Sequence, residues 1–146
     1  MQRLESLFRR FAKRSNARWW IGKRPQVRES QLVRAIAQKV ALPTAINAPL
    51  EHGQMINLEW GSAAHILAVA GTTSLAYAKP SPSAGAFRDA KTALADLAGN
   101  ASFLSNGVWR TDQPLSWISL TASTFDCGLI GFDSTNAFIF WVEEED

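Results

Sequence analysis

The sequence predicts a single α+β domain, in which an antiparallel sheet of about five or six strands carries two or three helices packed mainly on one face. The length of 146 residues and the hydrophobic fraction of 47% suit one domain with its own core. Helical spacing of apolar residues appears early in the chain, and the strongest alternating runs lie at its end. Charged residues make up only 19% of the chain, which excludes intrinsic disorder.

The first predicted element is a basic amphipathic helix near the N-terminus. Its apolar side chains recur at the spacing of one helix face: Leu4, Leu7, Phe8 and Phe11. Lysine and arginine side chains surround the rest of the helix. We expect the apolar stripe to dock on the core. The alternative is a helix that lies on anionic lipid or nucleic acid.

Residues 15–25 break this helical pattern, and we interpret them as a connector. They contain two adjacent tryptophans, Trp19 and Trp20, among cationic side chains. Such rings can stack on bases, but they also close the edge of a core, which is the interpretation that we favour. Ser30 is then a suitable cap for a helix over residues 31–40, which ends before the next proline.

A short strand is predicted after an irregular crossing. Residues 41–53 contain two prolines and predict the crossing. Residues 55–60 alternate and predict the strand, with Ile56, Leu58 and Trp60 on the buried face.

The middle of the chain predicts a hairpin followed by the clearest helix. Residues 64–70 and 74–79 flank a loop of small residues, which favours the hairpin. A helix is the alternative there, because alanine is frequent and is a good helix former. Ser83 is a natural cap for the next helix, which we expect to run to Leu97 with Gly99 just beyond its end.

The end of the chain has the strongest β signal. Residues 100–114 look like a loop, and residues 115–121 alternate as a strand would. A strand over residues 125–132, a turn at 133–136 and a strand over 137–142 follow. Both faces of the last strand are apolar, which predicts a central strand that is covered on both sides.

Charge is divided along the chain. Residues 1–40 hold eleven Lys and Arg against two acids, a balance of +9, and the other 106 residues hold four bases against eleven acids, a balance of −7. We therefore divide the domain, residues 1–146, into a basic helical segment (1–40), a sheet-forming core (55–142) and an acidic tail (143–146) that leaves the sheet. Basic helices packed across the acidic part of the sheet would cancel some of this division.

No catalytic signature stands out, so we expect a protein that is not an enzyme and that holds no cofactor or metal. Cys127 beside Asp126 suggests a nucleophile that works with His65. However, neighbouring side chains of a strand point to opposite faces, and a buried inert thiol is favoured. One cysteine and two separated histidines do not make a zinc site. Glycine-rich phosphate-binding loops are absent.

The leading hypothesis is a non-catalytic inhibitor that binds a cognate protein. Aromatic anchors with a charged rim are typical of protein interfaces. The expected function is like that of a bacterial immunity protein, which neutralises a toxin by occluding its active site. A single cysteine and the lack of a secretory signal favour the cytoplasm. The predicted partner-binding residues are acidic: Asp112, Asp133, Glu143, Glu144, Glu145 and Asp146.

The alternative is a protein that binds nucleic acid or an anionic membrane through residues 1–28. Its predicted contact residues are Arg9, Arg10, Lys13, Arg14, Arg18, Trp19, Trp20, Lys23 and Arg24. Removing residues 1–28 should then abolish retention on heparin and leave a folded core. A homodimer is a further option, because the second face of the sheet needs a cover. A small enzyme that uses His65 ranks last.

Overall fold

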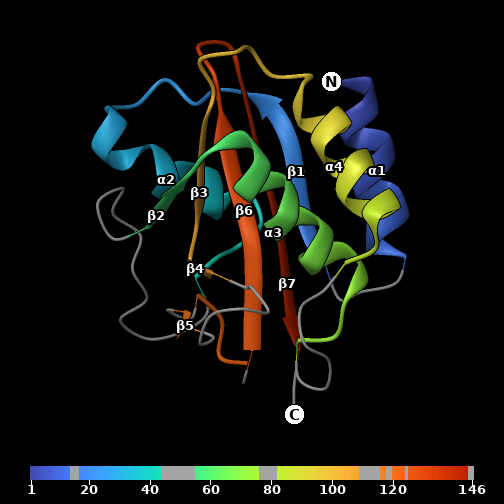
Figure 1. Cartoon of the computed structure of the whole chain (residues 1–146). Helices are drawn as coiled ribbons and strands as arrows, with labels where there is room; N and C mark the ends of the chain where they lie inside the picture. Colours follow the sequence, from blue (N-terminus) through green and yellow to red (C-terminus); the bar gives the residue numbers. More distant parts are fainter. Residues whose placement is uncertain are drawn as a thin grey trace.

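The computed structural model describes residues 1–13, 17–43, 55–75, 82–108, 116–117, 120–123 and 125–144. Within them the chain forms four helices, a five-stranded antiparallel sheet and a separate two-stranded sheet (Figure 1). The helices are α1 (Gln2–Ala12), α2 (Glu29–Gln38), α3 (Trp60–Thr72) and α4 (Ala84–Leu94). The strands are β1 (Ala17–Lys23), β2 (Ile56–Leu58), β3 (Ser102–Ser105), β4 (Gly107–Val108), β5 (Ser116–Trp117), β6 (Phe125–Phe132) and β7 (Asn136–Glu144). The predicted α+β class is confirmed.

The hairpin of β6 and β7 lies inside the main sheet, whose strand order is β1-β7-β6-β3-β2. Successive side chains of β7 alternate between two separate apolar clusters. Phe138 and Phe140 belong to one cluster, and Ile139 and Trp141 belong to the other, all of them buried. The prediction of an internal strand covered on both sides is therefore confirmed.

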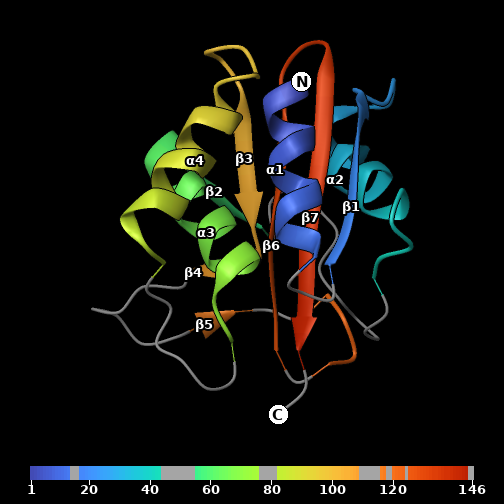
Figure 2. The same ribbon diagram turned by 90° about the vertical axis from the view of Figure 1, so that its right-hand side faces the viewer.

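The helices divide unequally between the two faces of the sheet. Figures 1 and 2 show α1, α3 and α4 on one face and α2 on the opposite face. The four apolar side chains of the α1 stripe are buried in the larger cluster, beneath α1. The docked helix that the sequence favours is thus confirmed, and its apolar face is already covered. Within the described segments, no helix has both the length and the apolar character needed to cross a membrane.

The expected connector at residues 15–25 is wrong, because most of it is β1. All seven residues of β1 pair with β7, from Ala17 opposite Val142 to Lys23 opposite Asn136. The two tryptophans follow the alternation of a strand: Trp19 packs against the cluster beneath α1, and Trp20 packs against the cluster beneath α2. Both rings are half-buried, so their predicted place at the core edge is confirmed.

The hairpin that we expected at residues 64–70 is also wrong, and its helical alternative is right. Eight positions of α3 are buried: Ala63, Ala64, Ile66, Leu67, Ala68, Val69, Ala70 and Gly71. A helix that is apolar on nearly all sides gives no 3.6-residue period, so periodicity cannot distinguish it from a buried strand. Residues 76–79 of the expected hairpin lie outside the described part.

The short strand before α3 ends earlier than predicted, and two of the three side chains on its expected buried face are exposed, while Leu58 is half-buried against the larger cluster. β2 stops at Leu58, and Trp60 begins α3. Ile56 keeps 40% of its surface exposed and Trp60 keeps 45%. The expected burial fails because β2 is an edge strand and because the chain changes from strand to helix within two residues.

Helix α4 begins as predicted, where the Ser83 Oγ accepts a hydrogen bond from the Ala86 N–H at 3.1 Å. It ends at Leu94, and tighter turns carry the chain on to Leu97. The expected loop at 100–114 contains β3 and β4 in its described part. The first two residues of the expected acidic tail, Glu143 and Glu144, remain in β7.

Candidate functional site

The predicted partner-binding acid Asp133 is buried and holds the fold together. It keeps 6% of its surface exposed. Its Oδ1 accepts hydrogen bonds from the N–H groups of Thr135 and Asn136 at 2.8 and 2.7 Å, and its Oδ2 accepts one from the Ala98 N–H at 2.9 Å. Burial by itself would raise the pKa of Asp133, but these N–H groups and the nearby Arg24 hold it below its ordinary value of 3.8.

Two further predicted acids lie together at the other end of β7, where each has intramolecular partners. Glu143 accepts hydrogen bonds from the Ser123 hydroxyl at 2.9 Å and from Arg18 at 3.3 Å. Glu144 accepts hydrogen bonds from the Ser74 hydroxyl at 2.6 Å and from the Leu75 N–H at 2.7 Å. The two residues are neighbours on a strand, so their carboxylates point to opposite faces of the sheet, and Asp133 lies at the far end of β7. Asp112, Glu145 and Asp146 lie outside the described residues.

The predicted basic residues of α1 are exposed and are partly neutralised by acids. Arg9 donates a hydrogen bond to Glu5 at 2.8 Å, and its guanidinium lies 5.5 Å from the centre of the Trp19 ring. Arg10 forms an ion pair with Asp89 of α4 at 2.8 Å. Lys13 caps the exposed end of α1, and Arg14 lies outside the described residues.

The basic residues of β1, and Arg24 just after it, lie on both faces of the strand. Arg18 donates to the Val40 carbonyl and to Glu143, while Arg24 donates to the Asp133 carbonyl and lies over the Phe132 ring. The Lys23 side chain is exposed. Together with the ion pair between Arg3 and Asp96, these contacts cancel part of the charge division, but the acids that pair with α1 lie on α4 and just after it and not, as had been expected, on the sheet.

A buried polar cluster lies beside β6 and was missed by sequence reasoning. The Asp126 Oδ2 accepts hydrogen bonds from the Leu120 N–H and from the N–H and hydroxyl of Thr121, at 2.7 to 2.9 Å. Its Oδ1 accepts one from the Asn106 amide at 2.6 Å. Burial raises the pKa of Asp126 even though these bonds oppose the shift. The sequence feature that could have predicted this cluster is an acidic residue, Asp126, within an otherwise apolar strand.

The cysteine nucleophile considered above has no geometric basis in the described residues. Cys127 is fully buried on the opposite side of β6, and its burial, together with the Asp126 charge, raises the pKa of its thiol well above 9.0. A thiol with a raised pKa is a poor nucleophile. His65 is half-buried on α3, and neither residue lines the hollows described below. His52 lies outside the described residues.

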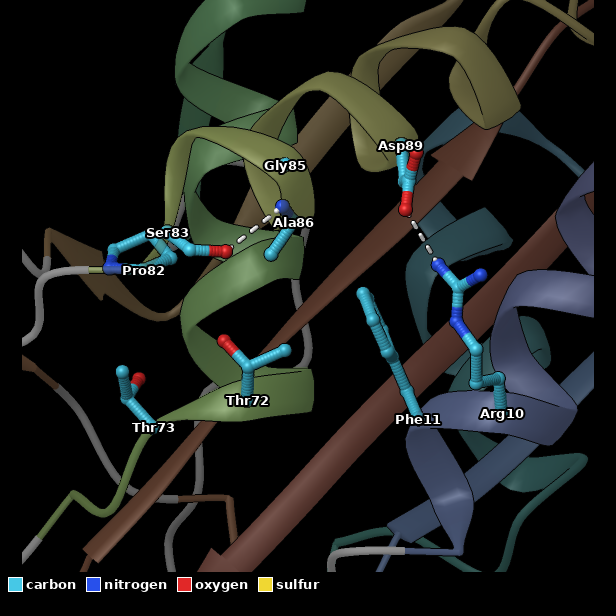
Figure 3. Close-up of a pocket in the computed structure, with 9 residues that line it drawn as sticks. All are labelled: Arg10, Phe11, Thr72, Thr73, Pro82, Ser83, Gly85, Ala86 and Asp89. Carbon is cyan, nitrogen blue, oxygen red and sulfur yellow. Dashed lines mark hydrogen bonds and ion pairs between the residues drawn. The ribbon is translucent and has the colours of Figure 1, made fainter.

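Among three hollows that described residues line, the largest has a volume of about 500 Å³ and lies where the ends of α1 and α3 meet the start of α4 (Figure 3). Its polar groups already have partners. Arg10 pairs with Asp89, and the Thr72 hydroxyl donates to the Ala68 carbonyl at 2.6 Å. A second hollow, of about 430 Å³, lies between α1 and α4 and shares Arg10 and Asp89. The rest of the second hollow is lined by surface side chains, among them Arg88.

The third hollow, of about 320 Å³, is an apolar groove beside Trp60. Its wall comes from β2, α4 and β3, and its apolar side chains include Leu58, Leu94 and Phe103. The transition from β2 into α3 places the Trp60 ring at its mouth. The indole Nε1 donates a hydrogen bond to the Lys91 carbonyl at 3.1 Å, and the Lys91 Nζ lies 4.7 Å from the ring centre.

These two contacts hold an exposed aromatic ring in one orientation beside an apolar hollow. An arrangement of this kind can receive an apolar side chain of another macromolecule. Sequence reasoning missed it because Trp60 was interpreted as the buried end of a strand. The groove and the Trp60 ring together are called the Trp60 groove below.

Comparisons with known proteins add no family to this description. Protein-family models, curated proteins and solved structures all gave no match to the chain. In the part of the chain that the structure describes, no group of three or more His, Cys, Asp and Glu side chains is arranged to hold a metal ion. The geometry of the Trp60 groove is therefore the basis for a functional proposal.

Proposed function

We propose that this chain is a binding protein that recognises another protein through the Trp60 groove. The observation that carries the proposal is the exposed Trp60 ring, fixed by Lys91 at the mouth of an apolar groove. Large exposed apolar side chains are few in the described residues: Val27, Ile56 and Trp60. Two of the three belong to β2 and the start of α3.

A fixed tryptophan is well suited to anchor a protein interface. Tryptophan is enriched among the side chains that dominate binding energy, particularly where it fills or borders a pocket. The contacts with Lys91 order the ring before binding, so association would lose little side-chain entropy. The apolar wall beside the ring offers surface that an aliphatic or aromatic side chain of the partner would bury.

The specific form of this proposal is an inhibitor of the immunity type, acting in the bacterial cytoplasm by occluding the active site of a toxin. Asp133, Glu143 and Glu144 have intramolecular partners. We therefore assign the main contact to the Trp60 groove. The acidic residues at the end of β7 would lie at the margin of the interface, where their charge would affect the association rate.

Affinity capture from a native lysate at two salt concentrations tests the proposal. The Trp60→Ala variant should bind the retained protein at least about 30-fold more weakly, because an interface anchor contributes about 2 kcal/mol or more. Val27→Ala is the matched control, since Val27 is also an exposed apolar residue, at 42%, but lies before α2. Calorimetry on the purified pair measures both variants. Equal binding by Trp60→Ala would refute the assignment.

A second function, binding of nucleic acid or an anionic membrane, has one supporting observation. The cationic side chains of α1, among them Arg9, Arg10 and Lys13, are exposed on one surface. The apolar stripe of α1 is buried, however, so this helix would not insert into lipid by that stripe. The paired variant Arg10→Glu and Lys13→Glu should lose retention on heparin or anionic vesicles if this function holds, while Trp60→Ala should keep it.

A further inference from the structure

Strand β1 is an open edge of the main sheet. It pairs with β7 and, among the described strands, with no other. Residues on an antiparallel pair alternate between those whose backbone groups bond to the neighbour and those whose groups point away. The Arg24 N–H donates to the Thr135 carbonyl at 2.8 Å, which continues the register of β1 with β7. The alternation then directs the backbone groups of Trp20 and Gly22 toward β7.

The other set of backbone groups points away from the sheet. By the same alternation, Ala17, Trp19, Ile21 and Lys23 present their N–H and C=O groups to the outer side of β1. Strand β7 agrees with this assignment. The Asp133 N–H donates to the Asn136 carbonyl, so the backbone groups of Phe138 and Phe140 face β6, and those of Ala137 and Ile139 face β1. This outer side of β1 is called the β1 edge below.

Cationic side chains flank the β1 edge on both faces. On the α1 side, Arg9 lies over Trp19, and Lys23 belongs to the same face of the strand as Trp19. On the α2 side, Lys39 lies 5.2 Å from the Trp20 ring centre. Arg18 and Arg24 lie on this side too. Glu5 and Glu143 are bonded to two of these cations, and Asp133 lies near Arg24, so five cations face three acids and the local balance is +2.

We propose that the β1 edge binds an extended, acidic segment of another protein, which adds to the sheet as a sixth strand. The outward backbone groups supply hydrogen bonds for an incoming strand whatever its sequence. The cations on both faces of the edge select acidic side chains on both faces of that strand. This surface is independent of the Trp60 groove, because β1 and β2 are the opposite edges of the sheet.

The charge of the β1 edge disfavours pairing with a second copy of the chain. Two β1 strands side by side would bring two surfaces of balance +2 together, and natural sheets use basic residues on edge strands to prevent such association. The regular backbone groups distinguish an extended polypeptide from nucleic acid, which would use the cations but would not need the outward N–H groups. The experiments below can detect either of these other occupants, a second copy of the chain or a nucleic acid.

Hydrogen exchange on the full chain tests the backbone part of the proposal. The probe is an acetylated eight-residue peptide in which pairs of Glu alternate with pairs of Val, so that both of its faces carry carboxylates. The amides of Trp19, Ile21 and Lys23 should exchange rapidly in the free chain and become protected when the peptide is added. The amides of Trp20 and Gly22 are the internal control, because their bonds to β7 already protect them. The same peptide with every backbone nitrogen methylated should give no protection, because neither of its edges can then donate hydrogen bonds to β1.

Charge variants test the selectivity. Lys23→Glu combined with Lys39→Glu should weaken binding of the acidic peptide about tenfold. Arg88→Glu is the matched control and should leave binding unchanged, because Arg88 lies on α4, which Figure 2 shows on the far side of α1 from β1. Four results would each overturn the proposal: absent protection, equal binding of the methylated peptide, protection that rises with protein concentration alone, or displacement of the peptide by short single-stranded DNA.

Discussion

The carboxylate of Asp133 joins two parts of the chain that are distant in sequence. It accepts two hydrogen bonds within the turn between β6 and β7 and one from Ala98, which follows α4. These N–H groups are the reason that the pKa lies below its ordinary value in spite of burial. Asp133 therefore stabilises the folded protein only while it is ionised.

The Asp133→Asn variant should lower the free energy of unfolding by about 1 to 2 kcal/mol at neutral pH, because an amide carries no charge and has only one accepting oxygen. Its NH2 group would therefore face either the Ala98 N–H or the N–H groups of the turn. Since the pKa of Asp133 is lower in the folded protein than in the unfolded chain, its contribution is present above pH 3.8 and is lost as the pH falls through the folded pKa. Urea unfolding from pH 7 to pH 2.5 should show the difference from wild type shrinking below about pH 4. A difference that stays constant would contradict this role.

The roles of individual side chains were the hardest feature of this protein to predict from the sequence. The burial of Cys127 follows from its place in an apolar strand and is confirmed. The roles of Asp133 and Trp60 depend on neighbours far away in sequence, Ala98 for the first and Lys91 for the second. No local pattern carries that information, because the spacing of residues along a chain says nothing about which segments meet in space.

Two glycines of α3 show how neighbouring elements limit a helix. Gly71 lies near its end, where an added Cβ would overlap the ring of Phe11 from α1. Gly61 lies near its start, where an added Cβ would meet no atom within 4 Å. The missing side chain at Gly71 thus lets α1 approach α3 closely, whereas the one at Gly61 has no such effect.

The Gly71→Ala variant should be less stable than wild type by about 1 to 3 kcal/mol, because relief of the overlap requires Phe11 or α1 to move. Gly61→Ala is the matched control in the same helix, and should raise stability by about 0.5 kcal/mol through the better helix propensity of alanine. Urea unfolding midpoints compare the two. Shifts of both variants in the same direction would contradict the packing argument.

Helices and strands that expose one face to solvent and have a recognisable cap at one end could be predicted from the sequence. Elements that are buried on all sides or lie at a sheet edge could not. The stripe of α1 and the Ser83 cap of α4 marked those helices. Residues of α3 are apolar on nearly every side, so no periodicity separated helix from strand. Strand β1 was missed because each of its tryptophans packs on a different face, which removes the contrast between an apolar and a polar side.

The division of charge along the sequence becomes a set of contacts in the folded molecule. Ion pairs join α1 to Asp89 and Asp96, and Arg18 of β1 to Glu143 of β7. Exposed pairs of this kind contribute little individually. Their positions nevertheless show that the basic segment belongs to the fold, since α1 covers the large cluster and β1 completes one side of the sheet.

Removal of residues 1–28 should therefore unfold the chain and not release a folded core. The deletion takes away the four buried side chains of α1. At about 1.5 to 3 kcal/mol for each large apolar side chain, their loss approaches the whole stability of a typical domain. It also exposes the edge of β7, which is otherwise internal. Circular dichroism and tryptophan fluorescence in urea should show no cooperative transition for the deleted chain.

A charge-only control separates the packing of residues 1–28 from their charge. Arg9→Gln combined with Lys13→Gln removes two exposed cations and leaves the buried stripe of α1 intact, so the cooperative transition should stay within about 1 kcal/mol of wild type. If the deleted chain instead unfolds with the midpoint of the full protein, the N-terminal segment is dispensable for the fold. If the glutamine variant unfolds like the deleted chain, the charge of the N-terminal segment and not its packing stabilises the molecule.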